Sequence, residues 1–585
     1  MKLVVSRSKN AASLYVTKSV YKDGKSTSFV VEKLGTEQEL RERLEGADPY
    51  VWAKEYVRQL TLQEKENNRK VLLEYSTAAI IPKDQQVCYN GGYLFLQKMY
   101  HELKLHKVCA DLQKRCKVTF SLHDVLSSLV YARILFPGSK LAAFETAKKF
   151  IEQPRFELQH IYRALEVIAK ESNAIQAALY RNSLKVCARD SSVLYYDCTN
   201  FFFEIEQADG LRQYGFSKEH RPNPIVQMGL FMDGNGLPLA FSVQEGNTNE
   251  QTTLQPLEQQ IIDDFALSRM VVCTDAGLSS TANRKFNNTN NRCFVTTQSV
   301  KKLKPHLHEW AFDLSGWSLE GDRSDKKRLY NLSDIFNMDF SDAANAKHKQ
   351  ALLQQTFYKE RWINEDGLEQ RFIVTYSLKY ALYQKHIRSQ QVERASRLID
   401  SGAARIEART PNDHRRFISK QAFTQDGEAA KKTRYAVNQQ RIQEESAFDG
   451  FYAVCTNLED PALAILKINR NRWEIEENFR ILKSQFKSRP VYLSREDRIK
   501  AHFTTCFISL LIYRLLEKRL DSTYTCDEIL SGLRNLNFHK TSQGYLPSYT
   551  RTDFSDHLHQ AFGFRTDFQI IDLALMKRII KASKS

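Results

Sequence analysis

The segment from Arg472 to Lys483 has the composition of an amphipathic helix that carries a row of charged side chains. At about 100° per residue, Glu476 lies about 40° and Lys483 about 20° from Arg472 around the helix axis, so the three form one row. Glu474 and Glu477 point away from the apolar side of this helix. A carboxylate between two cations suits a metal ion and a phosphate, and it would serve phosphoryl transfer if further carboxylates converge on it.

A second stripe of the same helix is apolar and lies directly beside the charged row. It comprises Ile475, Phe479, Leu482 and Phe486. Such a stripe predicts that the helix packs against a hydrophobic core. The charged row is therefore expected at the edge of that core.

Two aspartates elsewhere in the chain are candidate partners for Glu476. Residues 193–205 predict two consecutive strands with Asp197 near the end of the first, and residues 268–277 predict a buried strand that ends at Asp275. Ligands gather at strand ends in open α/β sheets. Carboxylates without a histidine or cysteine cluster favour Mg²⁺ or Mn²⁺ over zinc. A strand-end aspartate alone commonly caps a turn, so the charged helix is what favours a metal site.

The charge of the whole chain predicts a polyanionic partner. The net charge is +16 and the isoelectric point is about 9.2, which favours nucleic acid ahead of a membrane surface. A basic soluble enzyme without such a partner is the alternative. The length of 585 residues predicts several domains, and 42% hydrophobic with 26% charged residues is typical of a soluble globular protein.

Cysteine usage and hydropathy exclude several classes of protein. The ten cysteines include no Cys-x-x-Cys pair, which argues against a disulfide framework or zinc ribbon and indicates a reducing, cytoplasmic location. The first residues are too weakly apolar for a signal peptide. The most apolar helix, 503–516, is shorter than a membrane span and contains Arg514, so we expect a core helix and no membrane partner. His101 and His106 are five residues apart rather than four, which argues against a zinc-protease helix.

The pattern along the chain predicts an α/β core that is split by a long insertion. Residues 13–34 alternate like a hairpin with a turn at Asp23-Gly24, residues 36–70 are charged and helical, and residues 91–190 are helical. Strand patterns follow at 193 and return at 450 after a polar segment. The predicted domains are 1–75, a hairpin and charged helices; 76–190, a helical region, to which the resemblance given below assigns DNA binding; 191–300 with 448–515, the split core, to which it assigns catalysis; 301–447, a β-rich insertion; and 516–585, a helical C-terminal region.

Together these motifs resemble those of the DDE transposases of bacterial insertion sequences. The subgroup is the one with a Tyr-x2-Arg-x3-Glu-x6-Lys signature, which Arg472, Glu476 and Lys483 match in residue and spacing, whereas Asn469 stands at the tyrosine position. Glu-Gly-Asn at 245–247 resembles the loop that follows the third core strand in this group. The resemblance covers 190–300 and 448–515 and, more loosely, 91–185.

The resemblance implies an RNase H-like catalytic core and two kinds of site residue. The implied catalytic and metal-binding carboxylates, which would hold two Mg²⁺ or Mn²⁺ ions, are Asp197, Asp275 and Glu476. The implied DNA contacts are Arg472, Lys483, Asn469 and Arg480.

The function that the resemblance implies is cleavage at transposon ends followed by strand transfer into target DNA. The expected partners are the terminal inverted repeats, read by the N-terminal helical region, and target DNA, bound by a homodimer in the bacterial nucleoid. One alternative is an RNase H-like metal-dependent nuclease without strand transfer. The other is a catalytically inactive, transposase-derived DNA-binding protein, against which the intact carboxylates Asp197, Asp275 and Glu476 argue.

Overall fold

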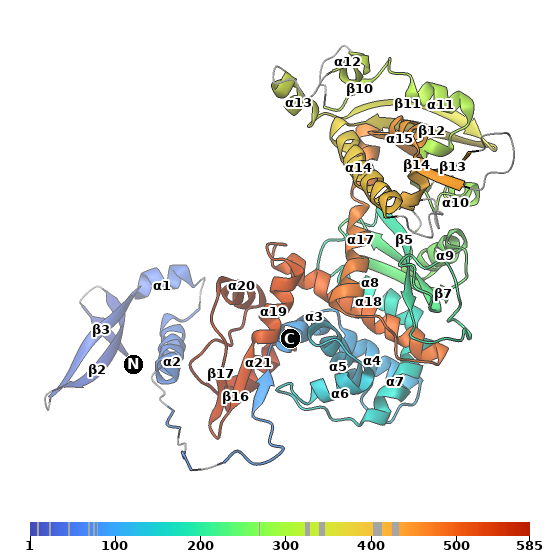
Figure 1. Ribbon diagram of the computed structural model, residues 1–585. Coiled ribbons are helices and arrows are strands. Elements are labelled where there is room, and N and C mark those ends of the chain that lie inside the picture. Colours follow the sequence, from blue (N-terminus) through green and yellow to red (C-terminus); the bar gives the residue numbers. More distant parts are fainter. Residues whose placement is uncertain are drawn as a thin grey trace. The chain divides into compact units, whose positions relative to one another are not determined.

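The computed structural model describes residues 1–8, 11–22, 25–44, 47–67, 71–73, 76–78, 80–267, 269–289, 291–321, 328–338, 345–401, 412–423 and 432–585. These residues form two compact units. The smaller unit comprises Met1–Gln85 with two short segments, Lys540–Leu546 and Ile570–Leu573, and the larger unit comprises the remainder. The elements of both units are labelled in Figure 1, and each unit is described by itself.

The smaller unit contains an antiparallel three-stranded sheet followed by two helices. Strand β2 is the central strand, and it pairs with β3 over the residues where the sequence predicts a hairpin; the predicted turn at Asp23-Gly24 lies outside the described residues. Thr36 caps the first helix through a reciprocal pair of hydrogen bonds with Glu39. The elements are β1 (Lys2–Arg7), β2 (Ala12–Lys22), β3 (Lys25–Thr36), α1 (Glu37–Arg43) and α2 (Pro49–Asn67). Their core comprises Leu14, Val16, Leu34, Leu40, Ala53 and Val57.

The larger unit begins with a short strand and six helices. Ser121 and Ser139 each accept a backbone N–H at a helix N-terminus, and Pro137-Gly138 separates the two helices that they cap. The strand β4 (Cys88–Asn90) pairs with β16 (Asn537–Lys540). The helices are α3 (Tyr93–Glu102), α4 (Leu105–Arg115), α5 (Leu122–Leu135), α6 (Lys140–Ala147), α7 (Leu158–Lys170) and α8 (Ser172–Ser183).

A nine-stranded sheet forms the centre of the larger unit, so the fold is mixed α/β as the sequence predicts. Its order is β10-β11-β12-β15-β9-β8-β5-β6-β7. The strands β5, β6 and β7 form an antiparallel meander, β8 and β9 then run parallel to β5, and β15 returns antiparallel to β9. These central strands are β5 (Val193–Phe202), β6 (Ile225–Asp233), β7 (Pro238–Glu245), β8 (Met270–Thr274), β9 (Arg292–Gln298) and β15 (Phe451–Thr456).

One face of this sheet is covered by two helices. The first is α8, which precedes β5, and the second connects β7 to β8. Side chains at alternate positions of β5, among them Tyr196 and Cys198, pack with α8 and α9 (Leu254–Phe265). The turn η1 (Glu250–Thr252) leads into α9, and α10 (Thr281–Phe286) follows β8. Burial of this face leaves the opposite side chains of β5, including Asp197, for the other side of the sheet.

The segment predicted as a β-rich insertion continues the same sheet and also contains helices. Strands β10, β11 and β12 extend the sheet beyond β15, whereas β13 and β14 pair separately. A core centred on Trp317, Phe372 and Phe451 joins them to the helices. The elements are η2 (Val300–Lys302), α11 (Pro305–Phe312), β10 (Ser318–Leu319), α12 (Ser333–Phe336), α13 (Ala346–Leu352), β11 (Phe357–Glu365), β12 (Leu368–Tyr376), α14 (Leu378–Asp400), η4 (His414–Phe417), β13 (Ile418–Phe423), β14 (Lys432–Val437) and α15 (Gln439–Ser446).

The single helix predicted over 472–483 is interrupted in the structure. Helix α16 (Ala462–Arg470) precedes α17 (Trp473–Arg480), and the chain then widens into a π-helical turn, η5 (Ile481–Gln485). The apolar stripe is nevertheless as predicted, because Ile475, Phe479, Leu482 and Phe486 are all buried. A π turn has more residues per turn than an α-helix, so the angular position of Lys483 does not follow from ideal α-helical geometry.

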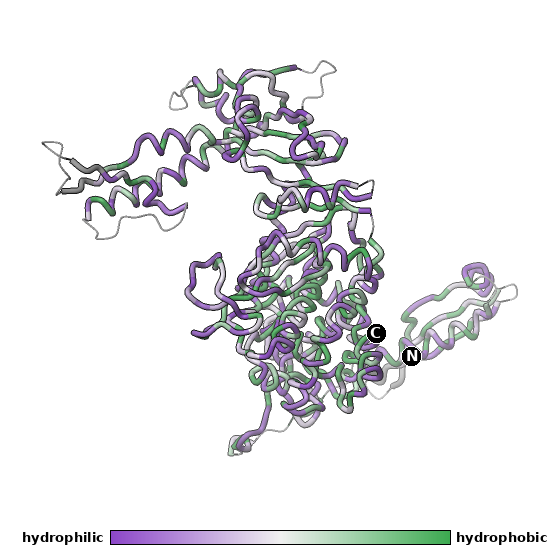
Figure 2. The backbone as a smooth tube through the Cα atoms, turned by 90° about the vertical axis from the view of Figure 1, so that its right-hand side faces the viewer, coloured by the Kyte–Doolittle hydropathy of each residue, from purple (hydrophilic) through white to green (hydrophobic). Residues whose placement is uncertain are grey.

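Helix α18 (Glu496–Arg519) runs through the core of the larger unit. Every residue from 501 to 516 is buried, and the helix packs against α3, α5 and α7 and against β7. The prediction that this helix is shorter than a membrane span is wrong: at 24 residues it has the length and composition to cross a membrane, and 89% of its most apolar window is buried inside the protein. Figure 2 colours the backbone by hydropathy, with hydrophobic residues in green.

The C-terminal region contains short strands as well as the predicted helices. It includes α19 (Cys526–Asn535), β16, β17 (Gly544–Pro547), α20 (Asp553–Phe562), β18 (Ile571–Asp572) and α21 (Leu573–Ala582). The strand pairs are two or three residues long, below the length at which alternating hydrophobicity becomes recognisable.

Candidate active site

Asp197 and Asp275 both lie just beyond the parallel pairing of two adjacent strands. The last parallel pair between β5 and β8 is Tyr195 with Cys273; Asp197 follows two residues later within β5, and Asp275 follows two residues later, directly after the end of β8. Neighbouring strands lie about 4.8 Å apart, so the two carboxylates lie side by side where the parallel pairing ends. The sequence prediction of two strand segments is wrong, because β5 is one continuous strand whose second half pairs with β6 alone.

The helix with the charged row lies over the same face of the sheet as Asp197. Side chains two residues apart on a strand share a face, so Tyr195 and Asp197 point the same way. The hydroxyl of Tyr195 donates to the carbonyl oxygen of Ile468 in α16 at 3.0 Å. Helix α17, which follows directly, packs against β5. The segment that carries Arg472 is thus positioned above the two aspartates.

The surroundings of Asp197 oppose its negative charge. Burial raises the pKa of Asp197 to about 7; Lys218 acts in the lowering direction, and the neighbouring Asp275 raises it further. The backbone N–H of Cys198 donates to Oδ1 of Asp197 at 2.8 Å. A buried carboxylate with a second carboxylate beside it is suited to a bound cation, which would offset both burial and the repulsion of Asp275.

Asp275 is held by the turn that ends β8. Its Oδ1 accepts the backbone N–H of Leu278 at 3.0 Å, and its carbonyl oxygen accepts the hydroxyl of Thr296 at 3.3 Å. These bonds show that the aspartate does cap a turn. They use one carboxylate oxygen and leave the other free of backbone bonds in the described structure. Turn capping and ligand binding are therefore compatible at this residue.

Arg472 connects the aspartates with Glu476. Burial works against the charge of Arg472, but Tyr452, Asp275 and Asp197 outweigh it and raise the pKa of the guanidinium. Nη1 of Arg472 lies 3.7 Å from Oε1 of Glu476, and Nε of Arg472 is buried without a hydrogen-bond partner among the described residues. Arg472 therefore interacts with Glu476 and also with the two aspartates, Asp197 and Asp275.

Glu476 itself is the most open of the three carboxylates. Its side chain is 64% exposed, and among the described residues the ligand oxygens of Asp197, Asp275 and Glu476 do not all lie within 4.8 Å of one another. The neighbouring glutamates are engaged elsewhere: Glu474 lies against Gly236, and Glu477 accepts hydrogen bonds from Arg480. An all-oxygen donor set of this kind fits Mg²⁺ or Mn²⁺, whose binding would require Glu476 to move inward.

Lys483 lies in the π turn and is largely buried. Burial and the nearby Lys218 lower the pKa of Lys483 to about 8, whereas Asp197 acts in the opposite direction. Nζ of Lys483 lies 3.3 Å from Oε1 of Glu219 and 5.5 Å from the ring centre of Phe201. Lys483 is thus placed on the aspartate side of the helix.

Asn469, which stands at the position of the signature tyrosine, contacts a different tyrosine. Its Nδ2 donates to the hydroxyl of Tyr452 at 3.0 Å, and that hydroxyl lies 2.6 Å from Oγ1 of Thr297. Tyr452 belongs to β15 and lies close enough to affect the pKa of Arg472. The sequence offered no signal for Tyr452, because its partners are brought together by strand pairing alone.

Arg480, the fourth predicted DNA contact, lies away from this cluster. Its side chain is 63% exposed and donates two hydrogen bonds to Glu477, at 2.7 and 2.6 Å. The hydrogen bonds and the ion pair that its side chain forms within the described residues are with Glu477. The structure therefore does not bring Arg480 together with Arg472 and Lys483.

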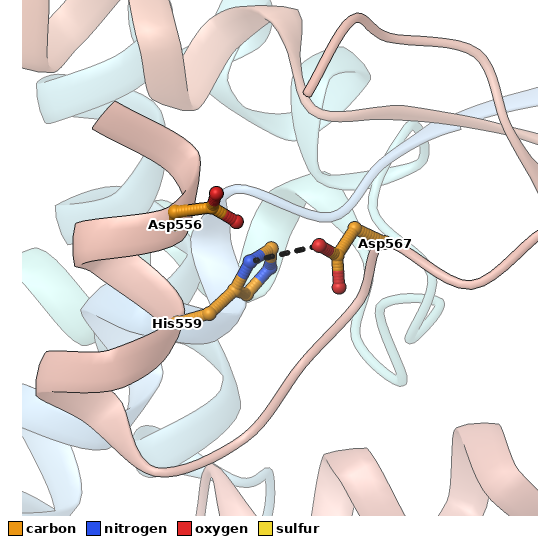
Figure 3. A group of neighbouring side chains, drawn as sticks. All are labelled: Asp556, His559 and Asp567. Carbon is orange, nitrogen blue, oxygen red and sulfur yellow. Dashed lines mark ion pairs between the residues drawn. The ribbon is translucent and has the colours of Figure 1, made fainter. Parts of the chain in front are cut away.

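A second group of potential metal ligands, Asp556, His559 and Asp567, is shown in Figure 3. Nε2 of His559 accepts the backbone N–H of Thr566 at 3.1 Å, so the proton of the neutral ring is on Nδ1, which faces Asp567 at 3.8 Å. Arg565 donates to both aspartates. The group is accounted for as a hydrogen-bonded ion-pair network rather than a metal centre.

Comparison with known proteins identifies the class to which this chain belongs. Residues 192–512, more than half of the chain, match the family model of the transposase DDE domain. The chain therefore belongs to the DDE transposase family, and it is a transposase, an enzyme that cleaves DNA. Enzymes of this family generally use divalent metal ions.

The other comparisons add less. The cryo-EM structure of a piggyBac transposase synaptic complex with hairpin DNA is similar over 84% of this chain and 85% of that chain, at 8% identity and a TM-score of 0.35. A likeness of this size carries no argument about the fold. No curated protein matches the chain.

Proposed function

We propose that this transposase cleaves DNA at transposon ends and transfers the freed strand into target DNA, with Asp197, Asp275 and Glu476 as its catalytic carboxylates. The observation that carries the proposal is that Asp197 and Asp275 both follow the last pair of the parallel strands β5 and β8 and both act on Arg472, which precedes α17. The reaction consists of two phosphoryl transfers. Water first attacks the phosphodiester at the transposon end, and the released 3′-hydroxyl then attacks a phosphodiester of the target.

The catalytic core in this proposal is RNase H-like and is interrupted by an insertion. Support comes from the strand order β7-β6-β5-β8-β9, in which an antiparallel meander precedes two parallel strands. The chain leaves this core after β9 and returns at β15, just before α16 and α17. Residues 301–447 are then the insertion, 76–190 the region that binds terminal repeats, and 1–75 and 516–585 the flanking regions.

The carboxylates of the proposed site would hold two ions, Mg²⁺ or Mn²⁺. Two ions bound there would stabilise charge on the attacking and leaving oxygens of each transfer. The protein's own contribution is to hold Asp197 and Asp275 at one edge of the sheet and to aim Arg472 toward them. Because burial raises the pKa of Asp197 to about 7, ion binding at neutral pH is coupled to loss of its proton.

The phosphates of the transferred strand would be held by Arg472 and Lys483. Arg472 offers a planar guanidinium whose buried Nε has no hydrogen-bond partner in the part of the chain that the structure describes, a geometry suited to a phosphate. Lys483 supplies a point charge on the same side of the sheet. Asn469, hydrogen-bonded to Tyr452, is a further candidate contact.

The wider setting of the proposal is a bacterial insertion sequence. We infer a homodimer that binds two terminal inverted repeats and a target in the cytoplasmic nucleoid, without a membrane partner. Support comes from the family and from the net charge of +16.

The test is cleavage and strand transfer by purified protein on duplexes taken from the DNA that flanks the gene. Glu476→Gln is expected to abolish Mg²⁺-dependent cleavage while end binding stays within about threefold of wild type. Glu477→Gln, one residue along and paired with the exposed Arg480, is the matched control and should remain active. Continued cutting by the Glu476 variant would refute the site. Cutting by the wild type without joined products would indicate a nuclease instead of a transposase.

A further inference from the structure

Three cationic side chains from different parts of the chain converge on one carboxylate, Glu219. Its Oε1 lies 3.3 Å from Nζ of Lys483 and contacts Nη1 of Arg489, and its Oε2 lies 3.8 Å from Nε of Arg221. Within the part of the chain that the structure describes, none of the three forms an ion pair with another carboxylate. The cluster therefore retains an excess of positive charge around a single acidic group.

Two aromatic rings hold these cations in place. Phe201 and Phe202 are successive buried residues at the end of β5, the strand that carries Asp197. The ring centre of Phe202 lies 4.1 Å from the guanidinium carbon of Arg221 and 5.7 Å from that of Arg489. Lys483 lies over Phe201. Contacts of this kind orient the cations without neutralising them.

Two of the three cations are also withdrawn from water. The side chains of Lys483 and Arg489 are 13% and 22% exposed, and that of Glu219 is 27% exposed, whereas that of Arg221 is 51% exposed and borders the solvent. Charges in such surroundings interact more strongly than charges on an open surface. A site with this geometry and sign binds a group that carries one negative charge and several acceptor oxygens, which is the description of a backbone phosphate.

The loop that carries Glu219 is anchored on both sides of the residue. Nδ2 of Asn200 donates to the carbonyl oxygen of Phe216 at 3.0 Å, and Nζ of Lys218 lies 3.2 Å from Oε1 of Glu250. The backbone N–H of Arg221 donates to Oγ of Ser217 at 3.1 Å. Because the backbone is fixed, departure of Glu219 from the cluster requires rotation of its side chain alone.

We propose that Lys483, Arg489 and Arg221 form a phosphate-binding subsite for a DNA strand, and that Glu219 is a resident counter-ion that a backbone phosphate displaces. The inference rests on the proposed function, because it takes Lys483 as a contact to the strand that enters the active site. It adds Arg489 and Arg221 to that contact. It also assigns Glu219 the role of an internal competitor that weakens binding of DNA.

The experiment compares Glu219→Gln with Glu477→Gln in the full-length protein. Both variants gain one unit of net charge, but Glu477 pairs with the exposed Arg480, away from the cluster. Binding of short fluorescent duplexes is measured in EDTA over a range of salt concentrations. One duplex comes from the DNA that flanks the gene, and the other is an unrelated sequence of the same length.

Glu219→Gln is expected to bind about 3- to 10-fold more tightly than Glu477→Gln at low salt, with a salt dependence steeper by about one phosphate contact. A gain confined to the flanking duplex assigns the subsite to the transposon end, and an equal gain with both duplexes assigns it to any strand. Equal affinity of the two variants, or weaker binding by Glu219→Gln, overturns the proposal.

A second measurement guards against misfolding of the variant. Inorganic phosphate should raise the melting temperature of Glu219→Gln more than that of the wild type, and the added change Arg489→Gln should remove this difference. An equal response of all three proteins would overturn the subsite. Because both measurements omit divalent metal and cleavage, a failed activity test with intact phosphate binding would refute the catalytic proposal alone.

Discussion

Asn469 donates a hydrogen bond to the hydroxyl of Tyr452 over 3.0 Å and thereby joins the helix before Arg472 to strand β15. The transposase signature that the sequence resembles has a tyrosine where this chain has Asn469. In this chain the hydroxyl of Tyr452, from strand β15, lies beside that position. The pair offers an explanation of how the departure from the signature is accommodated.

Tyr452→Phe should therefore weaken DNA binding and lower stability. The change removes a hydroxyl that Asn469 and Thr297 both contact, which costs about 1–2 kcal/mol of unfolding free energy. We expect DNA affinity to fall several-fold, measured by fluorescence anisotropy, because the hydroxyl that positions Asn469, a candidate DNA contact, is lost. Tyr383→Phe removes an exposed hydroxyl and is the control. Unaltered binding by Tyr452→Phe would separate this tyrosine from the DNA contact.

Asp197→Asn should stabilise the metal-free protein at pH 8 and not at pH 3. The folded pKa of Asp197, about 7, lies above the ordinary value of 3.8. Between these values the folded state holds a proton that the unfolded state has lost, so stability falls as the pH rises from about 4 to about 7. The asparagine variant escapes this loss, which amounts to a few kcal/mol. Thermal unfolding in EDTA checks the effect, and an equal difference at both pH values would contradict it.

Binding of Mg²⁺ should release a proton near neutral pH. The ion requires the ionised form of Asp197, so its affinity should rise with pH up to about 7 and then level off. Titration calorimetry in two buffers with different ionisation enthalpies measures the released proton. Asp275→Asn should abolish binding, whereas Glu477→Gln should not. Tight binding of Mg²⁺ by the Asp275 variant would count against the carboxylate pair.

His101→Phe should make the protein more resistant to acid. The ring of His101 stacks on that of His106 with centres 4.4 Å apart, and burial, then His106 and His123, lower the pKa of His101 to about 3. The unfolded state binds a proton below about pH 6.5 that the folded state refuses, so stability falls as the pH drops toward 3. Unfolding of the phenylalanine variant should show a shallower acid limb. His348→Phe, at an exposed position of α13, is the control.

Lys483→Ala and Arg480→Ala should differ in their effect on DNA binding. Lys483 lies on the aspartate side of the helix, whereas Arg480 is exposed and paired with Glu477. We expect the alanine change at Lys483 to reduce the salt dependence of binding by about one phosphate contact and that at Arg480 to have little effect. Equal losses from both changes would restore Arg480 as a DNA contact.

Local patterns in the sequence account for the elements that carry the site. The apolar stripe of the 472–483 segment is buried as expected, and the runs around Asp197 and Asp275 are strands. Such elements can be predicted because helices and strands each impose their own period of hydrophobic residues on a short stretch of sequence. The change from α- to π-helix after Arg480 was not predicted from the sequence, because no residue type in the segment requires a π-helical turn.

The sequence by itself determined which carboxylates and cations sit on recognisable strands and helices, together with the family to which their spacing points. The pairing of strands and the packing of helices and loops bring Asp275 close to Asp197, Tyr452 to Asn469, and Glu219 to Lys483, Arg489 and Arg221. These relationships join residues from separate strands, loops and helices. These relationships depend on strand register and on how the loops are anchored. Neither produces a periodic pattern in the sequence from which it could be predicted.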